Sequence, residues 1–498
     1  MSNSQEKKND DGLKVNKSQN GLLWMLLPKL PMIMRVVLLH ILRISESSRY
    51  LDLRSDVTLN ILRSFMDSPR PRPVGKTQAM TLTDPGIKGR IWVSKVASQV
   101  PPETSVRDAL VEVIRALSDD EARATGFNVP DVVPVEAEWT GYRAGVPDDA
   151  PLPDISEEEK YAAMMRECGN GKRTLLYFHG GAYYLCDPAT HRPLVKQLAK
   201  LTGGRVYSVR YRLAPQNPFP AALLDALVSY LALLYPPPGS IHEPVSASDI
   251  VFGGDSAGGN LTLVLTQTLL QLRRRNVKIA WFGAEREVPL PAAITLNSPW
   301  LDLAQSLPSW ADNQKWDYLP APKRLEEAEF PEEDGIWPPG PGTGQRPRRH
   351  LFVDDCLLLH PLVSAHLAQS WAGAPPTWVC CGWECLADED RYLVAKLRRD
   401  GVRVAFEEYE AMPHVFAAVI PRARESRRCL DSWAKFIVQA TEKPDEIESR
   451  YTCIKAKTLE ESEGDVAKLT PYAEKDVFDI AYGRLGREVP VPLFSSKL

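Results

Sequence analysis

From about Val135 onward, short apolar runs alternate with longer segments of helical period. The apolar runs are interpreted as strands: RTLLYFHGG, RVYSVRYRLAP, DIVFGG, AAITLNSPWLDL and PTWVCCGWE. The segments between them, such as HRPLVKQLAKLTGG and AGGNLTLVLTQTLLQLRRRN, place apolar residues three and four apart. Alternation of this kind builds a parallel sheet. The sequence therefore predicts an α/β fold with a mostly parallel central sheet and helices on both faces.

Composition narrows the class of protein. The 498 residues are 44% hydrophobic, which supplies a core for one large domain with additions. The net charge of −4 gives no electrostatic reason to expect nucleic acid as a partner. The eight cysteines show no C-x-x-C pair, which favours ordinary thiols in a reducing compartment over metal ligands.

The segment VFGGDSAGGN contains Gly254-Asp255-Ser256-Ala257-Gly258, a G-x-S-x-G pattern between an apolar run and a long helical segment. In that context the pattern is typical of a sharp strand-to-helix turn that exposes a serine hydroxyl at the edge of the sheet. The start of the following helix adds positive partial charge where an oxyanion would form. The sequence predicts Ser256 as a nucleophile.

A serine nucleophile needs a base and an acid that orients the base. His414, in EYEAMPHVFA, follows the last clear strand and has the expected place in the order serine, acid, histidine. Glu384 directly leaves the preceding strand, whereas Asp388 begins a helix, where carboxylates serve as caps. We expect Glu384 to be the acid and keep Asp388 as the alternative.

The segment FHGGAYYLCDP places two adjacent glycines after an early apolar run. Glycine has no Cβ, so its N–H can approach a ligand oxygen closely. Acyl transfer passes through a tetrahedral oxyanion that needs such donors. We expect Gly180, Gly181 and Ala257 to form an oxyanion hole.

In combination, HGGAYYL, YRLAPQNPFPAALLDA, GGDSAGGN, SPWLDL, HPLVS and GWECLADED resemble the hormone-sensitive lipase family of α/β-hydrolases from about Thr174 to Phe416. The resemblance implies an eight-stranded α/β-hydrolase core. It also implies a helical cap built from the N-terminal region and the segment after SPWLDL. His179 would then brace the oxyanion loop. The family usually carries aspartate at the position of Glu384.

The chain divides into regions of different amino-acid composition. Residues 1–20 are polar and predicted to be disordered. Residues 21–130 are predicted to hold apolar N-terminal helices, and residues 131–442 the catalytic domain. Within that domain, residues 315–349 are rich in proline and glycine and predict a surface loop, and residues 443–498 predict a polar tail.

Two segments carry predictions about where in the cell the protein is found. Residues 21–43 are apolar but interrupted by proline and charge, so they predict an interfacial helix on a membrane or a cap helix over a ligand pocket. Ser496-Lys497-Leu498 matches a peroxisomal address read by the import receptor. We expect a peroxisomal protein, with the surface of the endoplasmic reticulum or of lipid droplets as the alternative.

These features predict a serine carboxylic-ester hydrolase that acts through an acyl-enzyme on a hydrophobic ester, with no metal and no organic cofactor. One alternative is an acyl-CoA thioesterase or an acyltransferase of lipid or secondary metabolism, because the same machinery serves other leaving groups. An alternative of another class is a non-catalytic ligand receptor on a hydrolase fold.

Overall fold

The computed structural model describes residues 26–66, 73–119, 124–322 and 350–488. Two expectations therefore lie outside the described residues: the disordered segment 1–20 and the tripeptide Ser496-Lys497-Leu498. A third, the surface loop at 315–349, is described only as far as residue 322.

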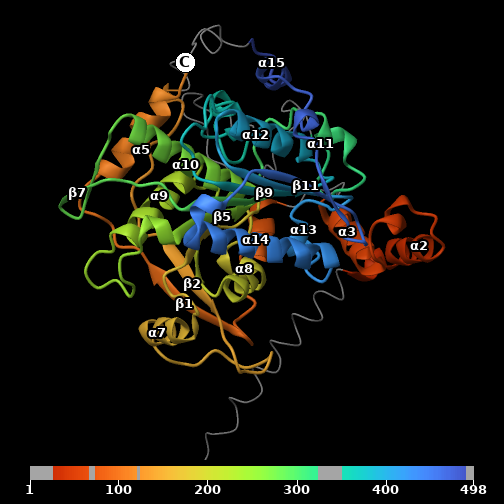
Figure 1. The fold of residues 1–498 in the computed structure, drawn as a ribbon, viewed down its shortest axis with the longest axis horizontal. Coiled ribbons are helices and arrows are strands. Elements are labelled where there is room, and N and C mark those ends of the chain that lie inside the picture. Colours follow the sequence, from red (N-terminus) through yellow and green to blue (C-terminus); the bar gives the residue numbers. More distant parts are fainter. Residues whose placement is uncertain (1–25, 67–72, 120–123, 323–349, 489–498) are drawn as a thin grey trace, which may run out of the picture.

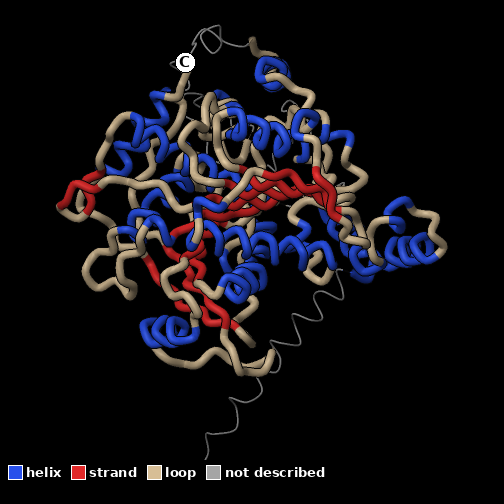
Figure 2. The backbone as a smooth tube through the Cα atoms, viewed as in Figure 1, coloured by secondary structure: helices blue, strands red, loops and turns tan. Residues whose placement is uncertain are grey.

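The centre of the molecule is a sheet, whose strands are red in Figure 2. It has ten strands in the order β1-β2-β4-β3-β5-β8-β9-β10-β11-β12. The pairings from β4 through β11 are parallel, and those at the two ends, β1/β2, β2/β4 and β11/β12, are antiparallel. The strands are β1 Ile91–Ala97, β2 Glu136–Tyr142, β3 Thr174–Phe178, β4 Arg205–Arg210, β5 Ile250–Asp255, β8 Ala293–Asn297, β9 Thr377–Gly382, β10 Val404–Tyr409, β11 Arg450–Ile454 and β12 Glu461–Glu463; β6 Ile279–Trp281 and β7 Ala284–Arg286 form a separate hairpin.

Helices cover both faces of this sheet, as the alternation predicted (Figure 1). One apolar cluster joins a face of the sheet to α5, α9, α10 and α12, and a second joins the other face to α8 and α14. All residues of α9 are buried, which explains why its sequence is apolar on every side. The main helices are α5 Ser105–Ala116, α7 Glu157–Glu167, α8 Pro188–Thr202, α9 Ala221–Leu234, α10 Ala257–Arg274, α12 Ala387–Arg399 and α14 Arg424–Glu442.

The strand register brings four loops to one edge of the sheet. Phe178 pairs with Gly254, so β3 and β5 end side by side. Asn297 of β8 pairs with Asp255 and with Cys380 of β9. Tyr409 of β10 pairs with Gly382 at the end of β9. The loops after β3, β5, β9 and β10 therefore leave the same carboxyl edge, where α/β sheets place their sites.

The α/β-hydrolase fold predicted from the sequence is confirmed, and the eight strands from β1 to β10 in the sheet order form the expected core. Two regions differ from expectation. Strand β1 pairs along its whole length with β2, so the sheet begins well before residue 131. The segment expected as a polar tail adds β11 and β12 to the sheet and a helix, α15 (Glu474–Arg484), whose Val477 and Phe478 are buried.

The N-terminal region forms a helical hairpin at one edge of the molecule, far from α7 and α15 (Figure 1). Helix α2 (Leu30–Ile41) packs on α3 (Leu53–Met66), and a shorter helix, α4 (Val74–Thr81), follows. Within the described ranges, no helix combines the length and the apolar character needed to cross a membrane.

The cap expected over the site is formed where α3 meets the segment after β8. Arg63 of α3 donates to the backbone oxygens of Lys315 and Asp317, at 3.0 and 2.6 Å. Asp317 is fully buried, and Trp316 is nearly so. Trp316 and Asp317, at the described beginning of the predicted surface loop, are therefore interior residues, whereas Lys315 and Ala321 beside them are exposed as the loop prediction expected.

Candidate active site

Ser256 occupies the sharp turn between β5 and α10. Its φ of 51° lies in the left-handed region, which a side chain adopts only when the surroundings hold it there. The neighbouring glycines make the turn possible. A Cβ on Gly254 would lie 2.3 Å from Gly258 O, and one on Gly258 would lie 2.0 Å from Phe178 O. The half-buried Ser256 hydroxyl is thus presented at the sheet edge.

Ser256, His414 and Glu384 form a continuous hydrogen-bonded chain. His414 Nε2 lies 2.8 Å from Ser256 Oγ, and His414 Nδ1 lies 2.9 Å from Glu384 Oε1. Each residue comes from a different loop at the carboxyl edge, following β5, β10 and β9. This order and geometry are those of a Ser-His-acid triad.

Electrostatics favour a basic His414. Burial by itself lowers the pKa of His414, but the hydrogen bond and the negative charge of Glu384 outweigh burial and raise that pKa above its ordinary value. Glu384 is completely buried and is held by two further donors, Ser298 Oγ at 2.7 Å and Gly382 N at 3.1 Å, both on Oε2. Oε1 is therefore left for the imidazole.

The alternative acid, Asp388, has other partners. Its carboxylate accepts from Ser309 N at 3.0 Å and lies 3.4 Å from an Arg391 nitrogen, at the start of α12. No contact with His414 is recorded for it among the described residues. Asp388 thus serves the local structure of the helix start, and the structure brings Glu384, not Asp388, to the imidazole.

Sequence reasoning did not identify two residues that hold the triad loops. Ser298 donates to Glu384 and accepts from Val415 N at 3.1 Å, so it joins the acid loop to the histidine loop. Asp317 accepts from Cys385 N at 2.8 Å and from His414 N at 3.4 Å. The only available signal for Ser298 was its place directly after the AAITLN strand. Nothing in the sequence distinguished Asp317 from the other acids of its segment.

The oxyanion loop corrects one expectation. The N–H of Gly180 donates to Asp255 Oδ1 at 3.1 Å, so it does not point toward a substrate oxygen. A Cβ on Gly180 would lie 2.3 Å from Asp255 Oδ2, which shows why glycine is needed there. Within the described ranges, no acceptor is recorded for the N–H groups of Gly181, Ala182 and Ala257. The expected donor set of Gly180, Gly181 and Ala257 therefore loses Gly180, whose N–H is already bound to Asp255.

His179 packs beneath this loop as a neutral group. Its ring stacks on Tyr211 with centroids 4.3 Å apart, its Nδ1 lies 2.7 Å from Gly180 O, and Tyr211 Oη donates to its carbonyl oxygen at 2.7 Å. Burial lowers the pKa of His179 to about 3, so the ring stays neutral at working pH. These contacts are those expected of a brace.

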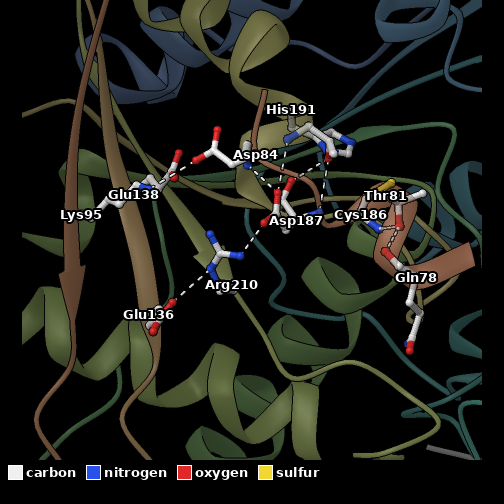
Figure 3. Close-up of polar contacts among 12 residues, drawn as sticks. Gln78, Thr81, Asp84, Lys95, Glu136, Glu138, Cys186, Asp187, His191 and Arg210 are labelled. Carbon is white, nitrogen blue, oxygen red and sulfur yellow. Dashed lines mark hydrogen bonds and ion pairs between the residues drawn. The ribbon is translucent and has the colours of Figure 1, made fainter. Parts of the chain in front are cut away.

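Residues beyond the loop are tied to the N-terminal region (Figure 3). Cys186 N donates to Thr81 Oγ1 at 3.1 Å, and Gln78 Nε2 donates to Tyr184 O at 2.9 Å. Asp187, which caps α8, also pairs with Arg210 at the end of β4. Helix α4 therefore fixes the segment that follows the oxyanion loop.

Comparison with known proteins agrees with this fold. A family model described as alpha/beta hydrolase fold matches residues 175–333 and 343–418. An acetyl-hydrolase of Streptomyces hygroscopicus is 32% identical over 284 residues, which cover 56% of this chain and 80% of the relative. An esterase of Acinetobacter venetianus is 31% identical over 256 residues, with coverages of 51% and 71%.

Solved structures show the same fold. An esterase from the bacterial hormone-sensitive lipase family superposes with a TM-score of 0.51 at 23% identity, covering 78% of this chain and 99% of that one. A hormone-sensitive lipase from a metagenome library gives the same TM-score and identity, with coverages of 79% and 99%.

The chain belongs to the α/β-hydrolase family that its motifs predicted. It is a carboxylic-ester hydrolase. The relatives named acetyl-hydrolase and esterase do not favour the thioesterase, acyltransferase or receptor alternatives.

Proposed function

We propose that this hydrolase cleaves hydrophobic carboxylic esters through an acyl-enzyme on Ser256. One observation carries the assignment of roles: the chain from Ser256 Oγ to His414 Nε2 at 2.8 Å, and from His414 Nδ1 to Glu384 Oε1 at 2.9 Å. A serine hydroxyl is a weak nucleophile, and a base within hydrogen-bond reach, itself oriented by a carboxylate, activates it.

The reaction proceeds in two halves. Ser256 Oγ attacks the ester carbonyl carbon while His414 Nε2 takes the hydroxyl proton, and Glu384 stabilises the imidazolium. When the tetrahedral intermediate collapses, the carbon–oxygen bond to the alcohol breaks and His414 protonates the leaving oxygen. Water then repeats the sequence on the acyl-enzyme, releasing the acid and restoring Ser256.

The oxyanion is bound by backbone donors. The N–H groups of Gly181, Ala182 and Ala257 are available, and Ala257 begins α10, whose N-terminus adds positive partial charge. Each such donor contributes roughly 2.7–4 kcal/mol to the transition state. Gly180 contributes indirectly, because its N–H fixes the loop to Asp255.

The hydrophobic substrate is supported by an aromatic ring beside the base. The Tyr318 ring lies 6.1 Å from the His414 ring. A relative from Moraxella is named Lipase 2. A strong preference for acetate esters of small polar alcohols would contradict this part of the proposal.

Hydrolysis of p-nitrophenyl esters with acyl chains of increasing length, by wild type and by Ser256→Ala, tests the function. We expect activity that rises from the acetate to longer chains and is lost in the variant. Asp388→Asn serves as a control, because Asp388 lies outside the triad chain. Full activity in Ser256→Ala would refute the assigned nucleophile.

The proposal includes two partners, the peroxisomal import receptor and a membrane surface. Ser496-Lys497-Leu498 would act as a peroxisomal import signal, which rests on the sequence alone. Fusion of residues 489–498 to a fluorescent protein tests it, and a diffuse signal would remove the claim. Residues 21–43 would contact a membrane surface. If the protein is not peroxisomal, this surface would be that of the endoplasmic reticulum or of lipid droplets.

A further inference from the structure

The outer face of α2 is an unusually apolar surface. Of the fourteen large apolar side chains that are exposed among the described residues, seven lie between residues 27 and 44. Met34 is 69% exposed and Ile44 is 66% exposed. Four of them recur at helical spacing within α2, namely Leu30, Met34, Leu38 and Ile41, whereas Leu27 precedes the helix and Leu42 and Ile44 follow it. We call this set the α2 ridge.

The other side of α2 is fixed to α3, so the ridge has a defined direction. His40 Nδ1 lies 2.7 Å from the buried Asp56 carboxylate, which also accepts from Ser47 Oγ and Asn60 Nδ2. Lys29 Nζ donates to Ser64 O at 3.0 Å. Because α2 lies at the outer edge of the molecule (Figure 1), the ridge faces away from the catalytic domain.

The charged residues within 26–45 all have one sign, and the first acid after them, Glu46, forms an ion pair with Lys315. Between residues 26 and 45 the chain carries Lys29, Arg35 and Arg43 and no aspartate or glutamate, although the whole protein has a net charge of −4. Arg35 and Arg43 are exposed. An apolar helical face bordered by cations matches the boundary between the headgroups and acyl chains of an anionic membrane.

We propose that the α2 ridge docks on an anionic lipid surface, with its apolar side chains among the acyl chains and Arg35 and Arg43 at the headgroups. A long apolar ridge that projects from the molecular edge suits a fluid surface that can close around it. The proposal goes beyond a general membrane contact, because it fixes the face, the charge of the lipid and the orientation of the enzyme.

The docked hairpin is coupled to the active site. Tyr50, which follows α2, packs on Trp316 and Trp383 with centroids 5.1 and 6.0 Å away. Trp383 directly precedes Glu384, and Asp317, next to Trp316, bonds His414 N at 3.4 Å. The triad is therefore held at a set orientation to the lipid.

A cavity lies between the ridge helix and the segment that holds the triad. It has a volume of about 370 Å³ between α2, α3 and Trp316, and its walls combine apolar side chains such as Met32 with charged ones such as Arg63 and Lys315. An ester drawn from the bilayer would enter this mixed cavity before it reaches the catalytic edge. This second step rests on the proposed ester hydrolysis, whereas lipid docking does not.

Co-sedimentation of the full-length protein with vesicles tests the docking. The vesicles are phosphatidylcholine alone and phosphatidylcholine with phosphatidylserine, and the proteins are wild type, Met34→Glu/Leu38→Glu and Leu201→Glu. Leu201 is a matched control, because it is an exposed leucine (41%) on another helix, α8. We expect wild type and Leu201→Glu to bind the anionic vesicles, and the double variant to bind at least tenfold more weakly.

Docking would be overturned if wild type bound no vesicles, if the double variant bound as well as wild type, or if wild type bound both vesicle types equally. It would also be overturned if binding emerged only after deletion of residues 1–25, because that segment would then cover the ridge. A dimer in light scattering that Met34→Glu/Leu38→Glu dissociates, with no vesicle binding, would assign the ridge to a second copy instead. Hydrolysis of soluble p-nitrophenyl butyrate is measured in parallel and should be equal in all three proteins. If none of the three proteins hydrolysed this ester, the proposed function would be contradicted and the docking result would still stand.

Discussion

Replacing Glu384 by glutamine probes the triad most selectively, because it removes a charge and leaves the shape. In the wild type, Oε2 accepts from Ser298 Oγ and Gly382 N, and Oε1 accepts from His414 Nδ1. A glutamine has a single acceptor oxygen. If that oxygen meets the Gly382 N–H, the amide NH₂ faces His414 Nδ1, and this nitrogen must then accept a hydrogen bond.

The consequence is the wrong tautomer of the base. With Nδ1 as an acceptor, the proton of the neutral imidazole lies on Nε2, the nitrogen that should take the proton of Ser256. The equivalent change in a serine protease lowers kcat by roughly 10⁴-fold. We expect a similar loss here, about 5.4 kcal/mol of transition-state stabilisation at about 1.36 kcal/mol for each tenfold.

Steady-state hydrolysis of p-nitrophenyl butyrate measures this effect, with thermal unfolding as a check on the fold. KM should change little, because the amide keeps the volume of the carboxylate. Asp388→Asn is the matched control, and its kcat should stay within a few-fold of wild type, because Asp388 contacts Ser309 and Arg391. A Glu384→Gln variant with kcat within tenfold of wild type, or an equal loss in Asp388→Asn, would refute the reasoning.

Three further predictions concern the same machinery. Because Glu384 raises the pKa of His414, kcat/KM should rise with pH through an inflection above 6.5, where the neutral base forms; an inflection below 6.5 would contradict this. Gly180→Ala places a Cβ 2.3 Å from Asp255 Oδ2 and should lower kcat by roughly 10²-fold through displacement of the oxyanion loop, whereas Gly483→Ala, with open space around its Cβ, should not. Ser298→Ala leaves Val415 N–H without its acceptor and should lower the free energy of unfolding by about 1–3 kcal/mol in urea titration; an unchanged midpoint would argue against the bridge.

The sequence was sufficient to choose the triad candidates because each lies within five residues of the end of a recognisable strand. In a parallel sheet, residues after the strands meet at one edge whatever their separation in sequence. Ser256 and His414 could thus be paired across 158 positions. The choice of Glu384 over Asp388 also followed from position, since only Glu384 leaves the strand before the helix begins.

The register of the oxyanion loop could not be predicted in the same way. Two glycines showed that the backbone approaches something closely, but not what it approaches. For Gly180 the neighbour is the Asp255 carboxylate, and only the fold brings the two together. Ala182 gave no signal, because its positive φ of 50° depends on the surrounding turn.

The C-terminal region differed from expectation for a related reason. Strand β11 lies beside β10 near the edge of the sheet, and only Ile454 among its five residues is buried. A strand that is mostly accessible needs no apolar alternation, so RYTCI read as part of a polar tail. Its parallel pairing with β10 depends on tertiary contacts that the segment does not encode locally.

The central claim, that Ser256 forms the acyl-enzyme, is tested most directly by covalent titration. A p-nitrophenyl alkylphosphonate would be attacked by Ser256 Oγ at phosphorus, releasing p-nitrophenolate and leaving a stable phosphonyl ester on the serine. Intact-mass measurement and peptide mapping should show one adduct on Ser256, formed with one equivalent of p-nitrophenolate and absent from Ser256→Ala and much slower in His414→Ala. An adduct on another residue, or equal labelling of Ser256→Ala, would contradict the account.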